Sequence, residues 1–230
     1  MEVIMKKYWW VIVLLGLLVV AGGLIYFVTT DFEEEIQLLE EMEEVYALMD
    51  EHNTDELNQK LDTIISTGDY AVVEKAAKNY TRDLYNVVTN ISNELANDRI
   101  MRLTTYENFQ NDGPEFTESK AYIIETKEKL ENYKTTYQEL YTEEKADAYL
   151  ETNLDSYYID FYHQIIGDEE EDTTTVNNID EIIEILTNSE AVIDFLIENK
   201  NSWTLENNMI SFTNDELSNQ YSELILKIAE

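Results

Sequence analysis

A run of 21 residues without a charged side chain, from Tyr8 to Val28, is the feature that most constrains how this chain can fold. As a helix rising 1.5 Å per residue, the run would span about 30 Å, the thickness of the hydrocarbon core of a bilayer. Two lysines precede the run and acidic residues follow it, which favours an amino terminus in the cytoplasm. The sequence therefore predicts a cytoplasmic tail at residues 1–7, a transmembrane anchor at residues 8–28 and an extracytoplasmic remainder.

A cleaved secretory signal is the main alternative to a retained anchor, because small residues gather at Val20-Ala21-Gly22. The apolar run continues beyond that point to Val28, and Trp9 and Trp10 suit the aromatic belt of a membrane interface. Both observations favour retention. The chain contains no cysteine, which excludes a lipid anchor on cysteine, disulfides and thiolate metal sites.

The part of the chain that follows the anchor is strongly acidic. The whole chain has 15 basic and 49 acidic residues, and removing Lys6, Lys7 and Glu2 leaves 13 basic against 48 acidic residues. Such a charge makes nucleic acid and anionic lipid poor partners. The acidic charge indicates an exterior that is salty, alkaline or rich in cations. Alternatively, it only keeps an ordinary helical bundle soluble.

Glycine and proline are rare after the anchor. They occur only at Gly68, Gly113, Pro114 and Gly167, and between these breaks apolar residues recur every three or four positions, the period of a helix. Strand-rich folds need more frequent turns than this. The sequence predicts a mainly α fold, with one transmembrane helix followed by a bundle of long helices over residues 31–166.

Four amphipathic helices are expected within this bundle. A short second helix begins at Asn53 and is closed by Gly68 as a carboxyl-terminal cap. A third helix is expected to reach as far as Gln110. A fourth begins at Thr117, and its apolar stripe changes register near Thr142, which indicates a kink or a new helix there. The first helix carries its apolar stripe at Phe32, Ile36, Leu39, Met42, Tyr46 and Met49.

An acidic segment separates the bundle from the carboxyl-terminal part. The five consecutive acids at residues 168–172 repel one another, which predicts a solvated linker over residues 167–177. A helix is expected from Asn178. Residues 178–230 are predicted to form a helix, a hairpin and a second helix that pack on the bundle.

Residues 203–212 break the helical period and predict a small β-hairpin rather than a continued helix. Asn207-Asn208 fits a two-residue type I′ turn, because asparagine tolerates the positive φ angles that this turn demands. The turn places Trp203 opposite Phe212, and pairing of two aromatic side chains across the strands supports this register.

A capping box of Thr213 and Glu216 begins the last helix, which ends in Tyr221-x-x-Leu224-Ile225. Together with Trp203-x-Leu205 and Ile210-x-Phe212, this ending resembles that of membrane-anchored extracytoplasmic proteins and lipoproteins of low-GC Gram-positive bacteria. The resemblance covers about 30 of the 230 residues and brings no catalytic residue with it. This chain lacks the lipid-bearing cysteine of the lipoproteins, so the resemblance implies a location in the cell envelope and no activity.

Motifs of catalysis and metal binding are missing from the sequence. His52 and His163 are far apart in the chain, and neither belongs to a His-Glu-x-x-His pattern. No glycine-rich phosphate loop and no Gly-x-Ser-x-Gly elbow occurs. The acidic clusters, at residues 33–44 and 168–172, lack the EF-hand spacing and predict weak cation binding only. We therefore expect no catalytic, cofactor or metal site.

The aromatic residues give the candidate interaction surface. Tyr133, Tyr137 and Tyr141 form a ladder at helical spacing, and Trp203 and Phe212 pair on the hairpin. Exposed rings can stack on sugars, which suggests a surface for a glycan or wall polymer. A buried tyrosine stripe with its hydroxyl groups near water explains the same spacing.

These observations predict a non-enzymatic, single-pass membrane protein whose acidic helical domain binds or scaffolds another component of the cell envelope. An envelope protein or a second copy of the chain is the expected partner, besides the membrane that holds the anchor. A binding module for wall polymer or divalent cations is the alternative, and an envelope hydrolase is a third hypothesis.

Overall fold

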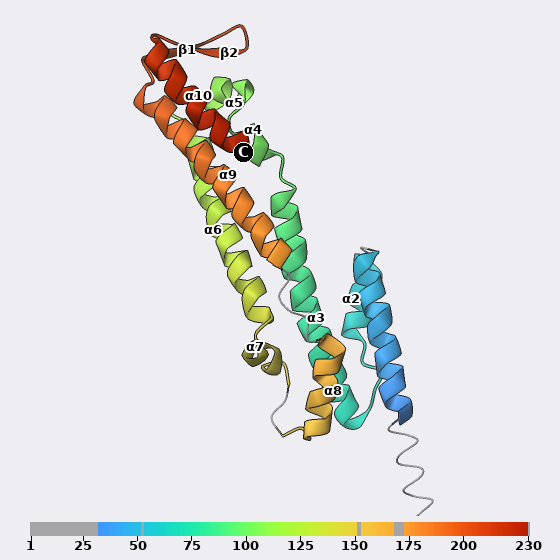
Figure 1. Ribbon diagram of the computed structural model, residues 1–230. Helices are drawn as coiled ribbons and strands as arrows, with labels where there is room; N and C mark the ends of the chain where they lie inside the picture. The colour runs from blue at the N-terminus through green and yellow to red at the C-terminus, as the bar shows by residue number, and fades with distance from the viewer. Residues whose placement is uncertain (1–31, 52, 151–152, 168–172, 230) are drawn as a thin grey trace, which may run out of the picture. The chain divides into compact units, whose positions relative to one another are not determined.

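The computed structural model describes residues 32–51, 53–150, 153–167 and 173–229 (Figure 1). The expected cytoplasmic tail, the transmembrane anchor and the five acids at residues 168–172 lie outside this part of the chain. Within it, no helix combines the length and the apolar character needed to cross a membrane. Helices dominate, and a two-stranded antiparallel sheet lies near the carboxyl end, which confirms a mainly α fold with a small hairpin.

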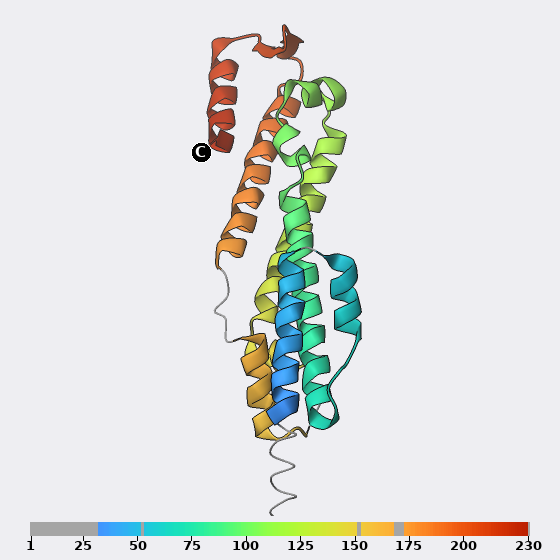
Figure 2. The same cartoon turned by 90° about the vertical axis from the view of Figure 1, so that its right-hand side faces the viewer.

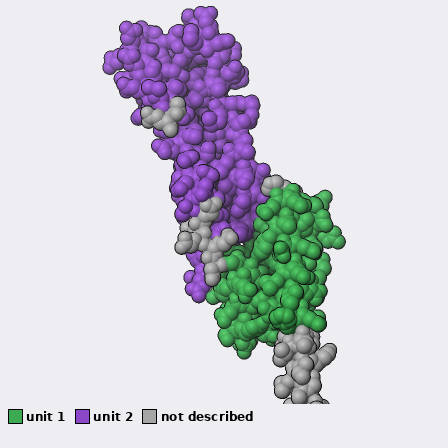
Figure 3. Space-filling view, turned by 45° about the vertical axis from the view of Figure 1, so that its right-hand side comes forward, with its two compact units in different colours: residues 1–82, 146–168 green, residues 83–145, 169–230 purple. Residues whose placement is uncertain are grey.

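The chain divides into two compact units, which Figure 3 shows in green and purple. Unit 1 takes residues 1–82 and 146–168, and unit 2 takes residues 83–145 and 169–230. Each unit therefore combines two separate stretches of the sequence.

Unit 1 packs four helical segments side by side, as Figures 1 and 2 show: a helix over residues 32–50, α2 (Thr54–Asp62), the first part of α3 (Gly68–Leu95), and α8 (Ser156–Ile166). Tyrosine hydroxyl groups link the first and last of them. Tyr46 donates a hydrogen bond to the carbonyl of Ile165 at 2.9 Å, and Tyr157 donates to Glu35 at 2.6 Å. The core between the helices includes Leu38, Met42, Leu57, Tyr70, Val73, Ala77, Phe161 and Tyr162.

The helix over residues 32–50 buries a face that overlaps its predicted apolar stripe only in part, since Met42 of the stripe is buried and Leu39, Tyr46 and Met49 are half-buried. The buried positions are Leu38, Glu41, Met42 and Val45. Phe32 and Ile36, which begin the predicted stripe, are exposed. The buried face includes Glu41 because this carboxylate forms ion pairs with two lysines of the same unit, which the periodicity of the helix alone does not reveal.

The end of the second helix also differs from the prediction. Helix α2 ends at Asp62, and an extended connection over residues 63–67 follows it. Gly68 begins α3 instead of closing α2, and its φ is +57°. A Cβ atom there would meet nothing within 4 Å, so the positive φ is the reason that glycine suits this position.

Unit 2 is built around two long antiparallel helices, α6 (Thr117–Leu140) and α9 (Thr173–Glu198). Three lysines of α6, seven residues apart, pair with acids that follow one another in reverse order along α9, which specifies the antiparallel arrangement. The pairs are Lys120–Asp194 at 2.5 Å, Lys127–Glu190 at 3.3 Å and Lys134–Asp180 at 2.5 Å. All three are partly exposed, so they contribute to register more than to stability.

The third helix is shorter than predicted. Helix α3 stops at Leu95, and the stretch to Gln110 is covered by α4 (Arg99–Arg102) and most of α5 (Tyr106–Asp112). Polar side chains offer the backbone other partners at these breaks, as such residues commonly do. Asn97 Oδ1 accepts a hydrogen bond from the amide of Arg99, and Thr105 Oγ1 accepts one from the amide of Asn108.

Two later boundaries can be compared with the sequence. The predicted break near Thr142 is confirmed, because α6 ends at Leu140 and the short α7 (Glu143–Asp147) follows. Helix α9 begins at Thr173 rather than at Asn178, so residues 173–177 of the predicted linker are helical. The consecutive acids that motivated the linker all precede this start.

The hairpin has the predicted register. Strands β1 (Trp203–Glu206) and β2 (Met209–Phe212) pair Trp203 with Phe212 and Leu205 with Ile210. The φ angles of Asn207 and Asn208 are 52° and 61°, as a type I′ turn requires. Trp203, Leu205, Ile210 and Phe212 are half-buried, and the side chains between them are exposed, so one face of the hairpin covers the unit.

The turn gives a first test. We expect Asn208→Gly to stabilise the hairpin, since glycine adopts a positive φ without a Cβ clash. Asn208→Ala should destabilise it by about 1 kcal/mol, because alanine lacks the local hydrogen bonding that helps asparagine in this region. Urea unfolding of the full chain in detergent, followed by Trp203 fluorescence after Trp9→Phe and Trp10→Phe, measures both changes. Equal stability of the two variants would contradict the turn conformation.

The last helix, α10 (Asp215–Ala229), is capped one residue later than the predicted box. Asn214 Oδ1 accepts a hydrogen bond from the amide of Leu217 at 2.9 Å, so Asn214 takes the place expected for Thr213. Threonine and asparagine are both good amino-terminal caps, so the sequence alone did not decide which of the two residues caps the helix. Helix α10 lies along α9, where Asn188 donates a hydrogen bond to the carbonyl of Lys227.

Candidate functional site

The structure places part of the predicted tyrosine ladder in the core of unit 2. Tyr137 is only 2% exposed, whereas Tyr133 and Tyr141 are half-buried. The ring centres of Tyr137 and Tyr141 lie 5.0 Å apart, and their hydroxyl oxygens lie 3.4 Å apart. The middle ring of the ladder is thus a packing residue in this structure. Stacking of the ladder on a glycan stays a prediction, which would depend on the two outer rings.

Trp203 and Phe212 meet across the hairpin but have different neighbours. The indole nitrogen of Trp203 donates a hydrogen bond to the carbonyl of Leu196 at 2.8 Å, and its ring centre lies 6.2 Å from that of Phe116. Phe212 packs on Tyr221 of α10, with ring centres 5.2 Å apart. Trp203 therefore anchors the hairpin to the unit, while Phe212 lies next to the space beside α10.

That space is a groove of about 380 Å³ in unit 2, to which α5, β2 and α10 contribute. Its volume lies within the range of small-ligand pockets, about 300 to 1,000 Å³. No lysine, arginine, histidine or carboxylate lines it. Its larger lining residues are Tyr106, Phe109, Met209, Ile210, Phe212 and Tyr221.

Sequence reasoning identified Phe212 of this lining and missed the two tyrosines. Tyr106 begins α5, within the stretch that the sequence predicted as the end of one continuous third helix. Tyr221 belongs to the expected apolar stripe of the last helix, and only the fold brings it to the groove. Burial raises the pKa of Tyr221 to about 12, so the ring stays neutral across the physiological range.

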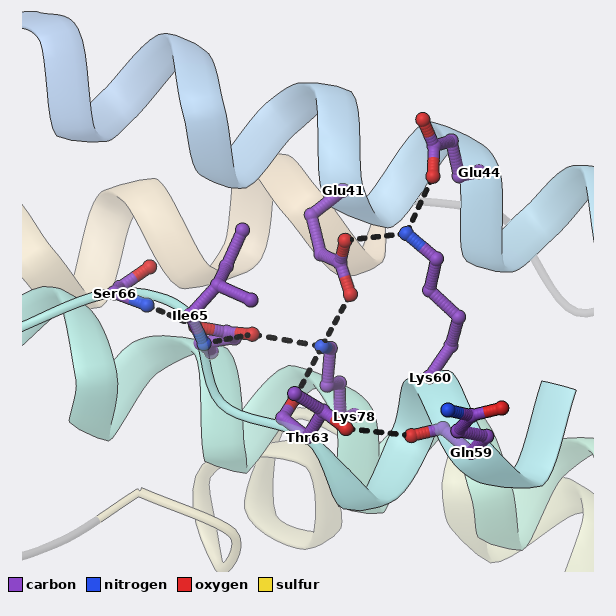
Figure 4. Close-up of polar contacts among 9 residues, drawn as sticks. Glu41, Glu44, Gln59, Lys60, Thr63, Ile65, Ser66 and Lys78 are labelled. Carbon is purple, nitrogen blue, oxygen red and sulfur yellow. Dashed lines mark hydrogen bonds and ion pairs between the residues drawn. The ribbon is translucent and has the colours of Figure 1, made fainter. Parts of the chain in front are cut away.

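Unit 1 contains a buried ion network, drawn in Figure 4. Its centre is Lys78, which is fully buried at 0% exposure. Lys78 Nζ lies 2.7 Å from Glu41 Oε1, 2.7 Å from Glu74 Oε1 and 2.6 Å from the carbonyl oxygen of Thr63. An ammonium group has three N–H donors, so each donor of Lys78 has an acceptor.

The two carboxylates of the network have further partners. Glu74 also accepts hydrogen bonds from the backbone amides of Ile65 and Ser66, the latter at 2.8 Å, and so holds the connection between α2 and α3. Lys60 of α2 donates to Glu41 at 2.7 Å and also contacts Glu44 (Figure 4). The network therefore joins the helix over residues 32–50 to both α2 and α3.

This arrangement is suited to holding helices together. The saturated Lys78 ammonium cannot turn toward a ligand without losing buried hydrogen bonds, which is costly. A hollow of about 270 Å³ reaches Glu41 and Lys60, but Lys78 and Glu74 do not line it. Burial alone would raise the pKa of Glu41, yet the hydrogen bonds and charges of Lys60 and Lys78 outweigh burial and hold that pKa below its ordinary value of 4.5.

The lowered pKa of Glu41 predicts how acid affects unit 1. A carboxyl group with a lowered pKa in the folded state stabilises the fold above its unfolded pKa, and this contribution is lost as pH falls through the folded value. We expect the stability difference between the native protein and Glu41→Gln to be largest near neutral pH and to shrink below about pH 4.5. Urea unfolding of both proteins between pH 7 and pH 3 tests this. A difference that stays constant over that range would contradict it.

The two histidines and the first acidic cluster have the following places in the structure. His52 lies outside the described residues, and the Nε2 atom of the half-buried His163 lies 2.9 Å from Oδ1 of the exposed Asp147. Across the described ranges, no group of three or more histidine, aspartate or glutamate side chains is placed to hold a metal ion. In the first acidic cluster, Glu34 and Glu35 accept hydrogen bonds within unit 1.

Comparison with protein-family models, with curated proteins and with solved structures gave no significant match. The case for a function therefore rests on the residues of this chain and their arrangement.

Proposed function

We propose that the protein is a non-enzymatic binding or scaffold component of the cell envelope, anchored by residues 8–28 and acting outside the membrane. The uncharged run is long enough for one span, and the lysines before it favour a cytoplasmic amino terminus. The helices and the hairpin that follow residue 31 then belong to the extracytoplasmic side.

The observation that carries the binding role is the groove of unit 2. Its lining combines aromatic rings, aliphatic side chains and small polar groups. Such a surface binds through shape, apolar contact and ring stacking. General acid–base catalysis uses histidine, carboxylate or lysine groups in most enzymes, and these are absent from the lining. The groove therefore supports binding better than it supports a reaction.

The charge of the chain narrows the choice of partner. With 15 basic and 49 acidic residues, the protein repels polyanions and attracts cationic surfaces. Another envelope protein, membrane-bound or secreted, is the partner that suits an anchored domain of this kind. Nucleic acid is not a partner under this proposal.

Crosslinking in intact cells tests the proposed role. The full chain, tagged at its carboxyl end, is crosslinked and purified from the membrane, and a chain with an unrelated apolar segment at residues 8–28 serves as control. We expect one stoichiometric envelope protein with both chains, since the outer units bind it. Recovery of wall polymer alone, or of no partner, would contradict a scaffold role.

Labelling of single cysteines tests the location. The chain has no cysteine, so one introduced at an exposed position is the only thiol. Leu226 is 62% exposed, and we expect Leu226→Cys to react with a membrane-impermeant maleimide in intact cells. Glu2→Cys, in the expected cytoplasmic tail, should react only after lysis. The reverse pattern would overturn the proposed orientation.

A further inference from the structure

The stretches that form the groove are mainly acidic. Residues 103–112 and 203–229, which include the whole of α10, contain six acidic residues and one basic residue, Lys227. Arg102, directly before the first stretch, pairs with Asp98. Asp112 is used within the fold, because its carboxylate accepts hydrogen bonds from the amides at the start of α6. The other five are exposed and form no ion pair within the described part of unit 2: Glu107, Glu206, Asp215, Glu216 and Glu223.

The rings of the groove add a second preference. Tyr106, Phe212 and Tyr221 are half-buried, so part of each ring stays open to the groove. Aromatic faces attract cations, and the planar guanidinium group of arginine stacks on them better than the ammonium group of lysine. The same unit contains such a pair, since the guanidinium carbon of Arg99 lies 4.2 Å from the ring centre of Tyr122. The aromatic rings of the groove, surrounded by acidic residues, are therefore suited to bind an arginine side chain.

The size of the groove and its apolar edge indicate a peptide segment. About 380 Å³ receives a few side chains and not a folded domain. Met209, 66% exposed, offers a flexible contact for an aliphatic neighbour of the arginine. We infer that the groove of unit 2 binds a basic, arginine-containing segment of another protein. This inference rests on the proposed binding function and names the site and the chemistry of the partner.

Defined peptides test the preference for arginine. The full chain is placed in nanodiscs of uncharged phosphatidylcholine, and binding of a fluorescent peptide of alternating arginine and leucine is followed by anisotropy at physiological salt. A lysine–leucine peptide has the same charge and spacing. We expect the arginine peptide to bind roughly fivefold more tightly, because it adds stacking to charge attraction. Equal affinity of the two peptides would contradict the inference that the aromatic rings of the groove bind arginine.

Two matched variants test the place of binding. Met209→Arg and Leu226→Arg change the net charge equally, and both residues are exposed apolar side chains of unit 2, at 66% and 62%. Only Met209 lines the groove. We expect Met209→Arg to weaken binding of the arginine peptide about tenfold, through repulsion within the site, and Leu226→Arg to change it less than about twofold. Circular dichroism checks that both variants are folded.

The outcomes separate the inference from the proposed function. If both variants weaken binding of the arginine peptide equally, the peptide is attracted to the acidic protein in general, and the groove is not its binding site. Self-association that Met209→Arg abolishes would make a second copy the occupant and overturn the choice of partner. If the Met209→Arg chain crosslinks to the envelope partner in the same yield as the native chain, the groove assignment fails while the proposed function stands. If the native chain crosslinks to nothing, the proposed function itself fails.

Discussion

Replacement of Lys78 with alanine is expected to lower the free energy of unfolding by about 3 to 5 kcal/mol, the cost of breaking a buried ion pair from one side. Lys78 is fully buried, and its removal leaves Glu41 paired with Lys60 alone among the cations of the described residues. Glu74 would keep only its hydrogen bonds to the backbone of the connection before α3. A carboxylate buried without a counterion is what makes the loss large.

Lys75→Ala is the matched control for this prediction. Lys75 lies on the same helix three positions earlier and is exposed, so its loss should change stability by less than about 0.5 kcal/mol. Urea unfolding of the full chain in detergent compares the two variants, and hydrogen exchange should locate the weakening of Lys78→Ala in unit 1. Unfolding of both variants at the same urea concentration would mean that the network contributes no stability.

Phe116→Ala is expected to destabilise unit 2 by about 3 to 5 kcal/mol, as truncation of a buried aromatic residue does. Phe116 is 0% exposed, and its ring meets that of Phe109 edge to face with centres 5.7 Å apart. Packing is equally close beside it, since a Cβ on Gly113 would lie 2.4 Å from the carbonyl oxygen of Phe109 and 3.2 Å from the ring of Trp203. The surroundings have little freedom to fill the space.

The neighbouring indole reports on this change. In a chain with Trp9→Phe and Trp10→Phe, Trp203 is the sole tryptophan, and its emission should shift to the red when Phe116 is truncated. Ile124→Ala, at a position 57% exposed on α6, should alter neither stability nor emission appreciably. A Phe116→Ala protein as stable as Ile124→Ala would show that the aromatic cluster does not hold the hairpin end of unit 2 together.

Features with local causes were predictable from the sequence. The hairpin depends on two adjacent asparagines and on strands of period two, and both signals lie within residues 203–212. The break after Leu140 follows from a change of helical register along the chain. The end of α3 at Leu95 escaped prediction because neither glycine nor proline marks it, and the hydrogen bond from the amide of Arg99 to the Asn97 side chain is not specified by helical periodicity.

Features that depend on distant partners were not predictable in the same way. Glu74 and Lys78 are four residues apart on one helix, a spacing typical of a solvated surface pair. Their burial is explained by Glu41, 37 positions away from Lys78, and by the connection before α3. The nearby buried Val73 and Ala77 were the available signal that this face is internal. The groove likewise brings together α5, β2 and α10, whose contact no local pattern specifies.

The composition of unit 1 sets an order of events during synthesis. Tyr46 and Ile165, which it joins by a hydrogen bond, are 119 positions apart, and Tyr157 and Glu35 are 122 apart. At roughly 5 to 20 residues per second, the ribosome needs on the order of 6 to 24 s to make the intervening stretch. Until α8 has been made, the earlier helices of unit 1 lack one of their packing partners. All of the chain from residue 83 to residue 145 must be synthesised before α8. The part nearest the expected anchor is therefore the first to be synthesised, yet it cannot close until α8 has been made, shortly before the last part of unit 2 follows.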